Sequence, residues 1–204
     1  MTPAAAWATL AATAFALGSI PSGVLVARRA GADPRRAGSR STGATNVLRV
    51  VGATAAAATL ALDFGKGAVA AWLAARWPGL DPAAPLFGTL AAACGHAWSP
   101  WLRGQGGKGI ATSAGGLAIA DPAALAISTA LFAAGVGVSR RVSVGSLVAA
   151  AGLPAVLAAL GRPRRDLALA ILLAVLVVFW HRSNLRRLLR GQEPVVGARG
   201  REDR

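Results

Sequence analysis

The chain has 204 residues, of which 54% are hydrophobic and 15% are charged, and its mean hydropathy is +0.52. Soluble domains carry charge on roughly a quarter of their residues, so this composition excludes an ordinary soluble domain and indicates an all-α integral membrane protein. The net charge of +14 resides in basic residues that flank apolar runs. This pattern argues against a nucleic-acid partner and favours anionic lipid headgroups and phosphorylated ligands.

The first apolar run, residues 4–27, predicts a membrane anchor and not a cleaved signal peptide. No basic residue precedes it, while Arg28 and Arg29 follow it. The positive-inside rule therefore places the N-terminus outside and the arginine-rich segment 28–46 in the cytoplasm.

The next apolar run, residues 47–77, is too long for one level crossing, because 31 residues of α-helix would extend about 46 Å. We expect either one long bent helix or a half-penetrating piece followed by a true span. Asp63 and Lys66 interrupt this run at helical spacing, so they can pair with each other, and we interpret the pair as structural.

Four more apolar runs follow, over residues 83–97, 117–138, 144–160 and 167–180, and Asp121-Pro122 breaks the second of them, so the stretch between Thr112 and Arg140 crosses out and back. The basic segments inside the cell require an odd number of crossings, and seven fits if residues 47–77 cross once. This scheme leaves the arginines of residues 162–165 outside, against the rule.

We therefore predict a polytopic helical bundle of about seven transmembrane helices, with the N-terminus outside and the C-terminus cytoplasmic. Residues 1–190 are expected to form a single membrane-embedded domain, and residues 191–204 a mobile, basic cytoplasmic tail.

The glycine-rich stretch 104–112 contains Lys108 and lies between two apolar runs. Glycine lets the backbone bend tightly and approach a ligand, and successive amides before a helix start can form an anion-binding concavity. This pattern predicts a phosphate cradle at a membrane surface; the alternative is a flexible loop with one interfacial lysine. The stretch is not a Walker A motif, because Gly109 occupies the position of the magnesium-binding hydroxyl.

The polar residues gather in four segments placed on one side of the membrane: residues 38–49, 95–112, 140–146 and 181–193. They supply cations, hydroxyls, glycine amides and histidine, without the His, Cys, Asp and Glu spacing of a metal site. Cys94 is the single cysteine and is interpreted as a small buried hydrophobe. Such residues suit the holding of phosphate groups in a transfer reaction whose substrates bring their own reactivity.

These segments resemble the motifs of the bacterial acyl-phosphate:glycerol-3-phosphate acyltransferases, the PlsY family. The matching residues are Gly38, Ser39, Gly43–Asn46 and Arg49; Gly95, His96 and residues 106–112; and His181, Arg182, Asn184, Arg187, Gly191 and Glu193. The Asp63 and Lys66 element and the segment 141–146 match as well, in the right order over nearly the whole chain. Arg40 and Ser41 depart from the usual Gly-Asn, which puts the backbone path of that loop in question.

The resemblance implies transfer of a fatty acyl group from acyl phosphate to the 1-hydroxyl of glycerol 3-phosphate, with no cofactor and no metal. It implies a multi-pass protein of the bacterial inner membrane whose active site faces the cytoplasm. The lipid bilayer and the peripheral enzyme that makes acyl phosphate are its expected partners.

The resemblance also implies which residues act. The expected catalytic residues are Ser39, Arg49, Lys108, His181 and Asn184. The expected substrate-binding residues are Gly43, Thr45, Asn46, Gly106, Gly107, Gly109, Ser146 and Arg182.

Several alternatives stay open at this level. His181 or a phosphate oxygen of a substrate is the base, and we favour the phosphate. Ser39, Thr45 and Asn46 could simply cap the next helix, and His96 could be a packing residue. A rival function is a transporter or channel for a phosphorylated anion, although the charges cluster at one face and not at mid-membrane.

Overall fold

The computed structural model describes residues 2–196, and every regular element in that range is a helix. The all-α prediction is therefore confirmed for this part of the chain. The chain divides into two compact units, residues 1–122 and residues 123–204. A single domain over residues 1–190 stays a prediction.

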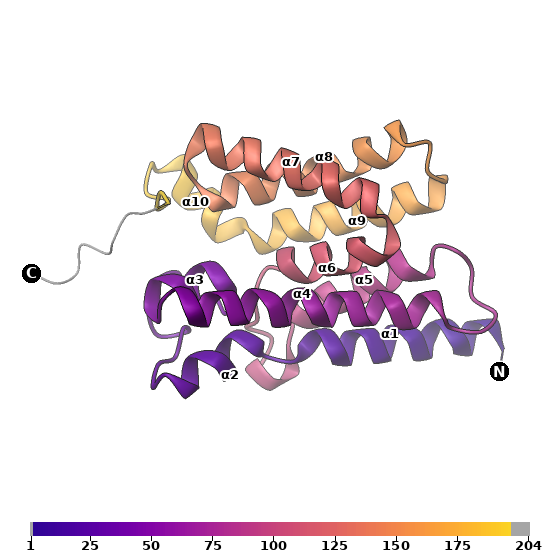
Figure 1. The fold of residues 1–204 in the computed structure, drawn as a ribbon, viewed down its shortest axis with the longest axis horizontal. Helices are drawn as coiled ribbons and strands as arrows, with labels where there is room; N and C mark the ends of the chain where they lie inside the picture. The colour runs from indigo at the N-terminus through magenta and orange to yellow at the C-terminus, as the bar shows by residue number, and fades with distance from the viewer. Residues whose placement is uncertain (1, 197–204) are drawn as a thin grey trace, which may run out of the picture. The chain divides into compact units, whose positions relative to one another are not determined.

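The first unit is built from six α-helices and one short 3-10 helix, η1, as far as residues 2–122 are described (Figure 1). Their bounds are α1 Pro3–Ser19, α2 Ser22–Arg29, α3 Ala44–Val50, α4 Ala53–Ala75, α5 Ala84–Ala97, η1 Pro100–Leu102 and α6 Ile110–Ala120.

Two breaks divide the apolar runs of this unit. The first falls at Ile20 and Pro21, between α1 and α2. There the amide of Val24 donates to the Pro21 carbonyl at the start of α2. The second falls at Gly52, whose φ of 128° is a conformation that favours glycine, between α3 and α4. Residues 47–77 are thus a short helical piece followed by one 23-residue helix, and a single continuous helix is excluded.

Small residues let the helices of the first unit approach closely. Helices α1, α4 and α5 meet through Ala14, Ala70 and Ala92, all buried. A Cβ on Gly67 of α4 would collide with the Thr112 carbonyl of α6, and a Cβ on Gly115 of α6 would collide with the Phe64 carbonyl of α4. Helices α4 and α6 therefore touch backbone to backbone, as small residues permit in membrane helix packing.

The second unit contains α7 (Pro122–Ser139, whose first residue belongs to the first unit), α8 (Val142–Ala159), α9 (Arg164–Trp180) and α10 (Arg182–Leu189). A Cβ on Gly145 of α8 would collide with the Phe132 carbonyl of α7, so these two helices also approach closely. Helix α8 packs along α9. Helices α9 and α10 are bent by 59°, with His181 at the break.

The start of the C-terminal segment is hydrogen-bonded to the turn between α7 and α8. The amide of Val196 donates to the Arg140 carbonyl at 2.7 Å, and Nε of Arg141 donates to the backbone carbonyl of Glu193 at 3.1 Å. These bonds fix the first residues of the predicted tail, while a basic, mobile cytoplasmic tail over residues 191–204 stays a prediction. Residues 197–204 of that predicted tail lie outside the described residues.

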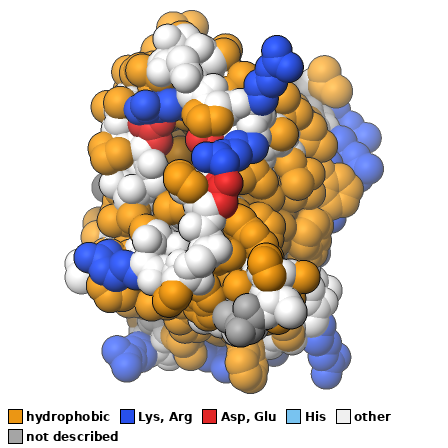
Figure 2. Space-filling view, turned by 90° about the vertical axis from the view of Figure 1, so that its right-hand side faces the viewer, with side chains coloured by type: hydrophobic (Ala, Val, Ile, Leu, Met, Phe, Trp, Pro, Cys, Tyr) orange, Lys and Arg blue, Asp and Glu red, His pale blue; other side chains and the backbone are white. Residues whose placement is uncertain are grey.

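Three helical stretches within residues 2–196 are long and apolar enough to cross a membrane: residues 3–29, 122–139 and 142–159. The bent pair of α9 and α10 makes a fourth if it forms one span. Figure 2 shows hydrophobic side chains over most of the face that it displays, with charged side chains in a few separate places. These features support an integral membrane protein, while the count of seven crossings stays a prediction.

We expect Gly67→Ala to lower the free energy of unfolding by about 1–3 kcal/mol, because the new methyl group must displace the Thr112 carbonyl. Gly65 lies on the same helix with no atom within 4 Å of the corresponding Cβ position. Gly65→Ala is therefore the matched control and should be neutral or stabilising by up to about 1 kcal/mol. Thermal unfolding in detergent measures both, and equal melting temperatures would contradict the packing account.

Candidate active site

A single asparagine organises the polar loop that precedes α3. Asn46 is 1% exposed. Its Nδ2 donates to three backbone carbonyls, those of Pro34 at 2.8 Å, Ala37 at 3.2 Å and Ser41 at 2.9 Å. Its Oδ1 accepts the amide of Ser39 at 2.8 Å. The Asn46 amide therefore holds the loop through Nδ2 and positions Ser39 through Oδ1, while substrate binding by Asn46 stays a prediction.

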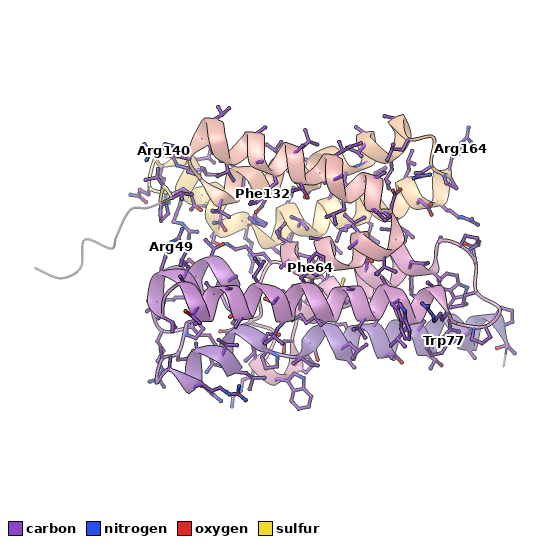
Figure 3. All side chains as sticks on the ribbon, viewed as in Figure 1. Arg49, Phe64, Trp77, Phe132, Arg140 and Arg164 are labelled. Atoms are coloured by element: carbon purple, nitrogen blue, oxygen red, sulfur yellow. The ribbon has the colours of Figure 1, made fainter. Side chains whose placement is uncertain are left out.

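The other predicted residues of this segment surround the organised loop. Ser39 and Thr45 are half-buried, and Arg49 is exposed in the last turn of α3 (Figure 3). The N-cap of α3 is Gly43, and no side chain makes a capping hydrogen bond there. The alternative that Ser39, Thr45 or Asn46 caps this helix is therefore wrong.

The departure at Arg40 has a structural consequence. Arg40 has a φ of 58°, in the left-handed region where a side chain is strained and glycine is not. The loop thus keeps the backbone path that a glycine would allow, and Arg40 adopts it at a cost. Gly43, in contrast, has an ordinary φ of −77°, and a Cβ there would meet nothing closer than Ser41 Oγ at 3.8 Å.

The glycine-rich stretch folds back over the C-terminal end of α5. The amide of Gly106 donates to the Ala97 carbonyl at 3.0 Å, and the amide of Gly107 donates to the His96 carbonyl at 3.1 Å. A Cβ on either glycine would collide with His96. These two amides are engaged inside the protein, and the glycines permit the close approach; substrate binding by Gly106 and Gly107 stays a prediction.

The stretch then turns into α6. Gly109 is the N-cap residue of α6 with a φ of 75°, and Lys108 beside it is half-buried. No side chain caps this helix start. The loop thus brings a lysine in the sequence directly before the positive end of the α6 dipole, a combination that favours an anion.

In the second unit, His181 lies at the bend between α9 and α10 and is 2% exposed. Its Nδ1 is 2.8 Å from the Val177 carbonyl. Because a carbonyl oxygen only accepts, Nδ1 carries the hydrogen in this contact, and Nε2 accepts whenever the ring is neutral. This tautomer suits either removal of a proton or, once protonated, a hydrogen bond to a phosphate.

Glu193 holds Asn184 on the first turn of α10. Nδ2 of Asn184 donates to Glu193 Oε1 at 2.6 Å, and Nε of Arg187 donates to Glu193 Oε2 at 2.7 Å. Glu193 is therefore ion-paired with Arg187. Burial raises the pKa of the Glu193 carboxyl, but the hydrogen bonds from Asn184 and Arg187 outweigh burial and hold that pKa below its ordinary value.

The ionised carboxylate determines how the Asn184 amide faces. A carboxylate only accepts, so Nδ2 must point to Glu193 and Oδ1 away from it. Oδ1 is buried and has no hydrogen-bond partner within residues 2–196. Asn184 therefore presents an acceptor, which suits a hydroxyl group better than a phosphate oxygen.

Two further predicted residues have local partners. Ser146 is buried and its hydroxyl donates to the Val142 carbonyl of its own helix at 2.9 Å. Arg182 is exposed and lies over the Phe179 ring at 4.7 Å. Ser146 must rotate its hydroxyl to donate to a ligand, and Arg182 is placed as a surface contact.

Residues 63, 66 and 96 form a buried ionic cluster that sequence reasoning finds only in part. Asp63 pairs with Lys66 at 2.9 Å, as the helical spacing predicted, and His96 Nδ1 lies 3.4 Å from the same carboxylate oxygen. No local signal joins His96 to a residue of another helix, so the sequence alone cannot separate this role from simple packing.

Within residues 2–196 there is no cluster of three or more His, Cys, Asp or Glu side chains that could hold a metal ion.

Comparison with known proteins identifies the family to which this chain is similar. Residues 8–191 match the glycerol-3-phosphate acyltransferase family. The chain is 44% identical to a glycerol-3-phosphate acyltransferase of Synechococcus sp. (strain CC9902), over 94% of this chain and 96% of the relative. It is also 44% identical to a glycerol-3-phosphate acyltransferase of Thermus thermophilus, over 96% and 97% of the two chains.

Two solved structures are similar to this chain as well. Both are crystal structures of PlsY, an integral membrane glycerol 3-phosphate acyltransferase. The glycerol 3-phosphate form has a TM-score of 0.88 and 34% identity, covering 94% of this chain and 96% of the other. The lysophosphatidic acid form has a TM-score of 0.85 and 33% identity, covering 94% and 95%.

We expect Asn46→Asp to lower the free energy of unfolding by about 2–4 kcal/mol, because a carboxylate would face three carbonyl oxygens without a hydrogen to donate. Thr45→Ala, one residue away on the same helix, is the control and should shift stability by less than about 0.5 kcal/mol. Thermal unfolding in detergent measures both, and an unchanged melting temperature for Asn46→Asp would refute the organising role.

Arg40→Gly should stabilise the protein by about 1 kcal/mol, since it removes the strain of a side chain at positive φ. Arg40→Ala keeps the Cβ and should give no such gain. A melting temperature for Arg40→Gly at or below that of Arg40→Ala would show that the loop is not strained there.

Proposed function

The chain belongs to the glycerol-3-phosphate acyltransferase family, and we propose that it uses acyl phosphate as the donor. In this reaction a fatty acyl group moves to the 1-hydroxyl of glycerol 3-phosphate. The products are 1-acyl-glycerol 3-phosphate, which is lysophosphatidic acid, and inorganic phosphate.

One observation supports the proposal: in each unit, residues that resemble the family motifs lie at helix ends or in the loops beside them. In the first unit, Arg49 and Lys108 supply cations beside a helix end and an organised loop. In the second, His181 and Asn184 supply an acceptor nitrogen and an acceptor oxygen. These are the groups that a reaction between two phosphorylated substrates requires.

The chemistry needs no covalent enzyme intermediate. The hydroxyl oxygen of glycerol 3-phosphate attacks the acyl carbonyl carbon, the bond from that carbon to the phosphate oxygen breaks, and phosphate leaves with the bonding electrons. Acyl phosphate is already an activated mixed anhydride. The protein's task is to bring two anionic substrates together and to orient the hydroxyl.

Two cations of different geometry, Arg49 and Lys108, are proposed to bind the substrate phosphates. The Arg49 guanidinium can bind a phosphate with two parallel N–H donors, while the Lys108 ammonium acts as a point charge. Ser39, whose backbone Asn46 fixes, adds a hydroxyl. Together these groups offset the repulsion between the two substrates.

The attacking hydroxyl needs acceptors and a base. The second unit supplies Asn184 Oδ1 as an acceptor for the hydroxyl hydrogen, and the His181 imidazole lies three residues away in the chain. We assign the proton to a phosphate oxygen of the substrate, because the carboxylate nearest this set, Glu193, is already engaged with Asn184 and Arg187. His181 then orients the hydroxyl.

The membrane arrangement is part of the proposal. The chain crosses the bacterial inner membrane seven times, with the N-terminus outside, the C-terminus in the cytoplasm and the active site facing the cytoplasm. Support comes from the basic ends of the helices and from the tryptophans at the far end of α4, where Arg76 lies 4.2 Å from the Trp72 ring. Figure 3 shows Arg49 and Trp77 at opposite ends of the first unit.

A peripheral enzyme that makes acyl phosphate is the proposed partner at the cytoplasmic face. Acyl phosphate is both greasy and reactive, so delivery at the membrane surface limits its loss to hydrolysis.

The donor comparison tests the proposed function. Purified protein in detergent is given glycerol 3-phosphate with acyl phosphate, acyl-CoA or acyl carrier protein. We expect lysophosphatidic acid and stoichiometric inorganic phosphate with acyl phosphate alone. Product formed only from a thioester donor would overturn the proposed donor.

Lys108→Ala should lower kcat/KM by at least about 100-fold, because it removes a full charge aimed at a phosphate. Lys108→Arg, which keeps the charge with a different shape, should recover part of the loss. Near-normal turnover of Lys108→Ala would exclude a phosphate role for the glycine-rich stretch.

His181→Gln should lower kcat about tenfold without removing the acidic limb of the pH–rate profile, because His181 orients the hydroxyl and is not the base. A loss of roughly 10²–10⁴-fold together with disappearance of that limb would instead identify His181 as the general base.

A further inference from the structure

An ionic cluster made of Asp63, Lys66 and His96 is buried in the first unit. The three residues are 1%, 8% and 7% exposed. Lys66 Nζ and His96 Nδ1 lie 2.9 and 3.4 Å from the same oxygen of Asp63. Buried charges persist when they are paired and hydrogen-bonded, and this carboxylate has a cation on its own helix and an imidazole from α5.

The cluster reaches the glycine-rich stretch through the His96 ring. Nδ1 faces Asp63, and Nε2 on the other side lies against the Cα of Gly107, where a Cβ would collide with it. The Gly107 amide also donates to the His96 carbonyl. The residue that follows in the chain is Lys108, so the orientation of one imidazole ring limits where this lysine can lie.

The cluster also reaches the break between α1 and α2. Lys66 Nζ donates to the Ile20 carbonyl at 2.9 Å, at the residue before Pro21. The chain of contacts thus runs from Ile20 through Lys66, Asp63 and His96 to Gly107. It joins three segments that are separated by many residues in the sequence.

We propose that Asp63 and His96 are positioning residues for Lys108, acting through the contact between the imidazole and Gly107. The proposal rests on the role given to Lys108 in the proposed function. The Asp63 carboxylate lies 3.4 Å from Nδ1 and orients the imidazole by electrostatic attraction, and the oriented ring sets the path of the backbone that carries the lysine. Neither residue touches the reacting atoms in this account.

His96→Phe is the decisive variant, because it keeps a ring against Gly107 and removes the ring nitrogen that faces Asp63. Two quantities are measured. The first is kcat/KM for glycerol 3-phosphate. The second is the rate at which an amine-reactive reagent modifies Lys108, monitored by peptide mass spectrometry. The chain has two lysines, Lys66 and Lys108, and Lys66 is buried, so the modification rate reports on the loop.

We expect His96→Phe to lower kcat/KM about tenfold or more and to change the Lys108 modification rate at least about threefold, since small displacements of a positioned group are costly. Asp63→Asn should give the same pattern and provides a second variant if one of them fails to fold. His96→Gln, which keeps a donor for Asp63, should recover part of the activity.

Thr89→Val is the matched control. Thr89 is buried on the same helix as His96 and donates to the Pro85 carbonyl of that helix, outside the cluster. Both quantities should stay within about twofold of the unaltered protein. A His96→Phe protein with a lower melting temperature but unaltered kinetics and Lys108 modification would overturn the proposal, because that is the result of a merely structural role.

The modification rate keeps this inference separate from the proposed function. Unaltered protein that forms no lysophosphatidic acid would refute the proposed reaction, yet a changed Lys108 rate in His96→Phe would still support the positioning. Active protein with an unchanged rate would refute the positioning alone.

Discussion

Lipid offers no hydrogen bonds, so a membrane chain must satisfy its buried polar groups from within. The first unit meets this constraint with one carboxylate, Asp63, whose partners come from α4 and α5. Such a pair can be buried only where backbones approach closely enough to exclude lipid, and Gly67, the residue after Lys66, provides that approach to α6. The buried charge pair therefore depends on the close packing of α4 against α6.

The same contact connects packing to chemistry. Gly67 touches the first turn of α6 at Thr112, and that turn begins just after Lys108. The α5 end supports the stretch from the other side through two backbone hydrogen bonds to Gly106 and Gly107. The proposed phosphate-binding lysine is therefore held by backbone geometry on both sides, which suits a residue whose charge must be in place before a substrate arrives.

The sequence could predict the helical class, the apolar runs and the candidate residues, because composition, periodicity and motif spacing are local properties. It could not predict how polar groups are used. Asn46 looks equally suited to binding a ligand and to bracing a loop, and only the positions of Pro34, Ala37 and Ser41 around it decide the matter. Likewise, the local sequence does not indicate that the Gly106 and Gly107 amides already donate to backbone carbonyls at the end of α5.

Pairings across long separations escape sequence reasoning for a similar reason. Asp63 with Lys66 follows from helical spacing, but His96 joins them through the fold. In the second unit the arginine partner of Glu193 can be expected from the basic sequence around it, whereas its bond to Asn184 cannot. That bond turns the Asn184 amide so that it presents its oxygen, which is an acceptor.

The interruption at Pro21 and the lysine on another helix depend on each other. Where α1 stops, the Ile20 carbonyl is left at the negative end of a helix dipole, and Lys66 brings a positive charge to it. A continuous first helix would deprive the ammonium of that oxygen and leave it with Asp63 alone. The kink in the first apolar segment is therefore part of how the protein tolerates a cation in its interior, and straightening that segment would alter the electrostatic balance on a different helix.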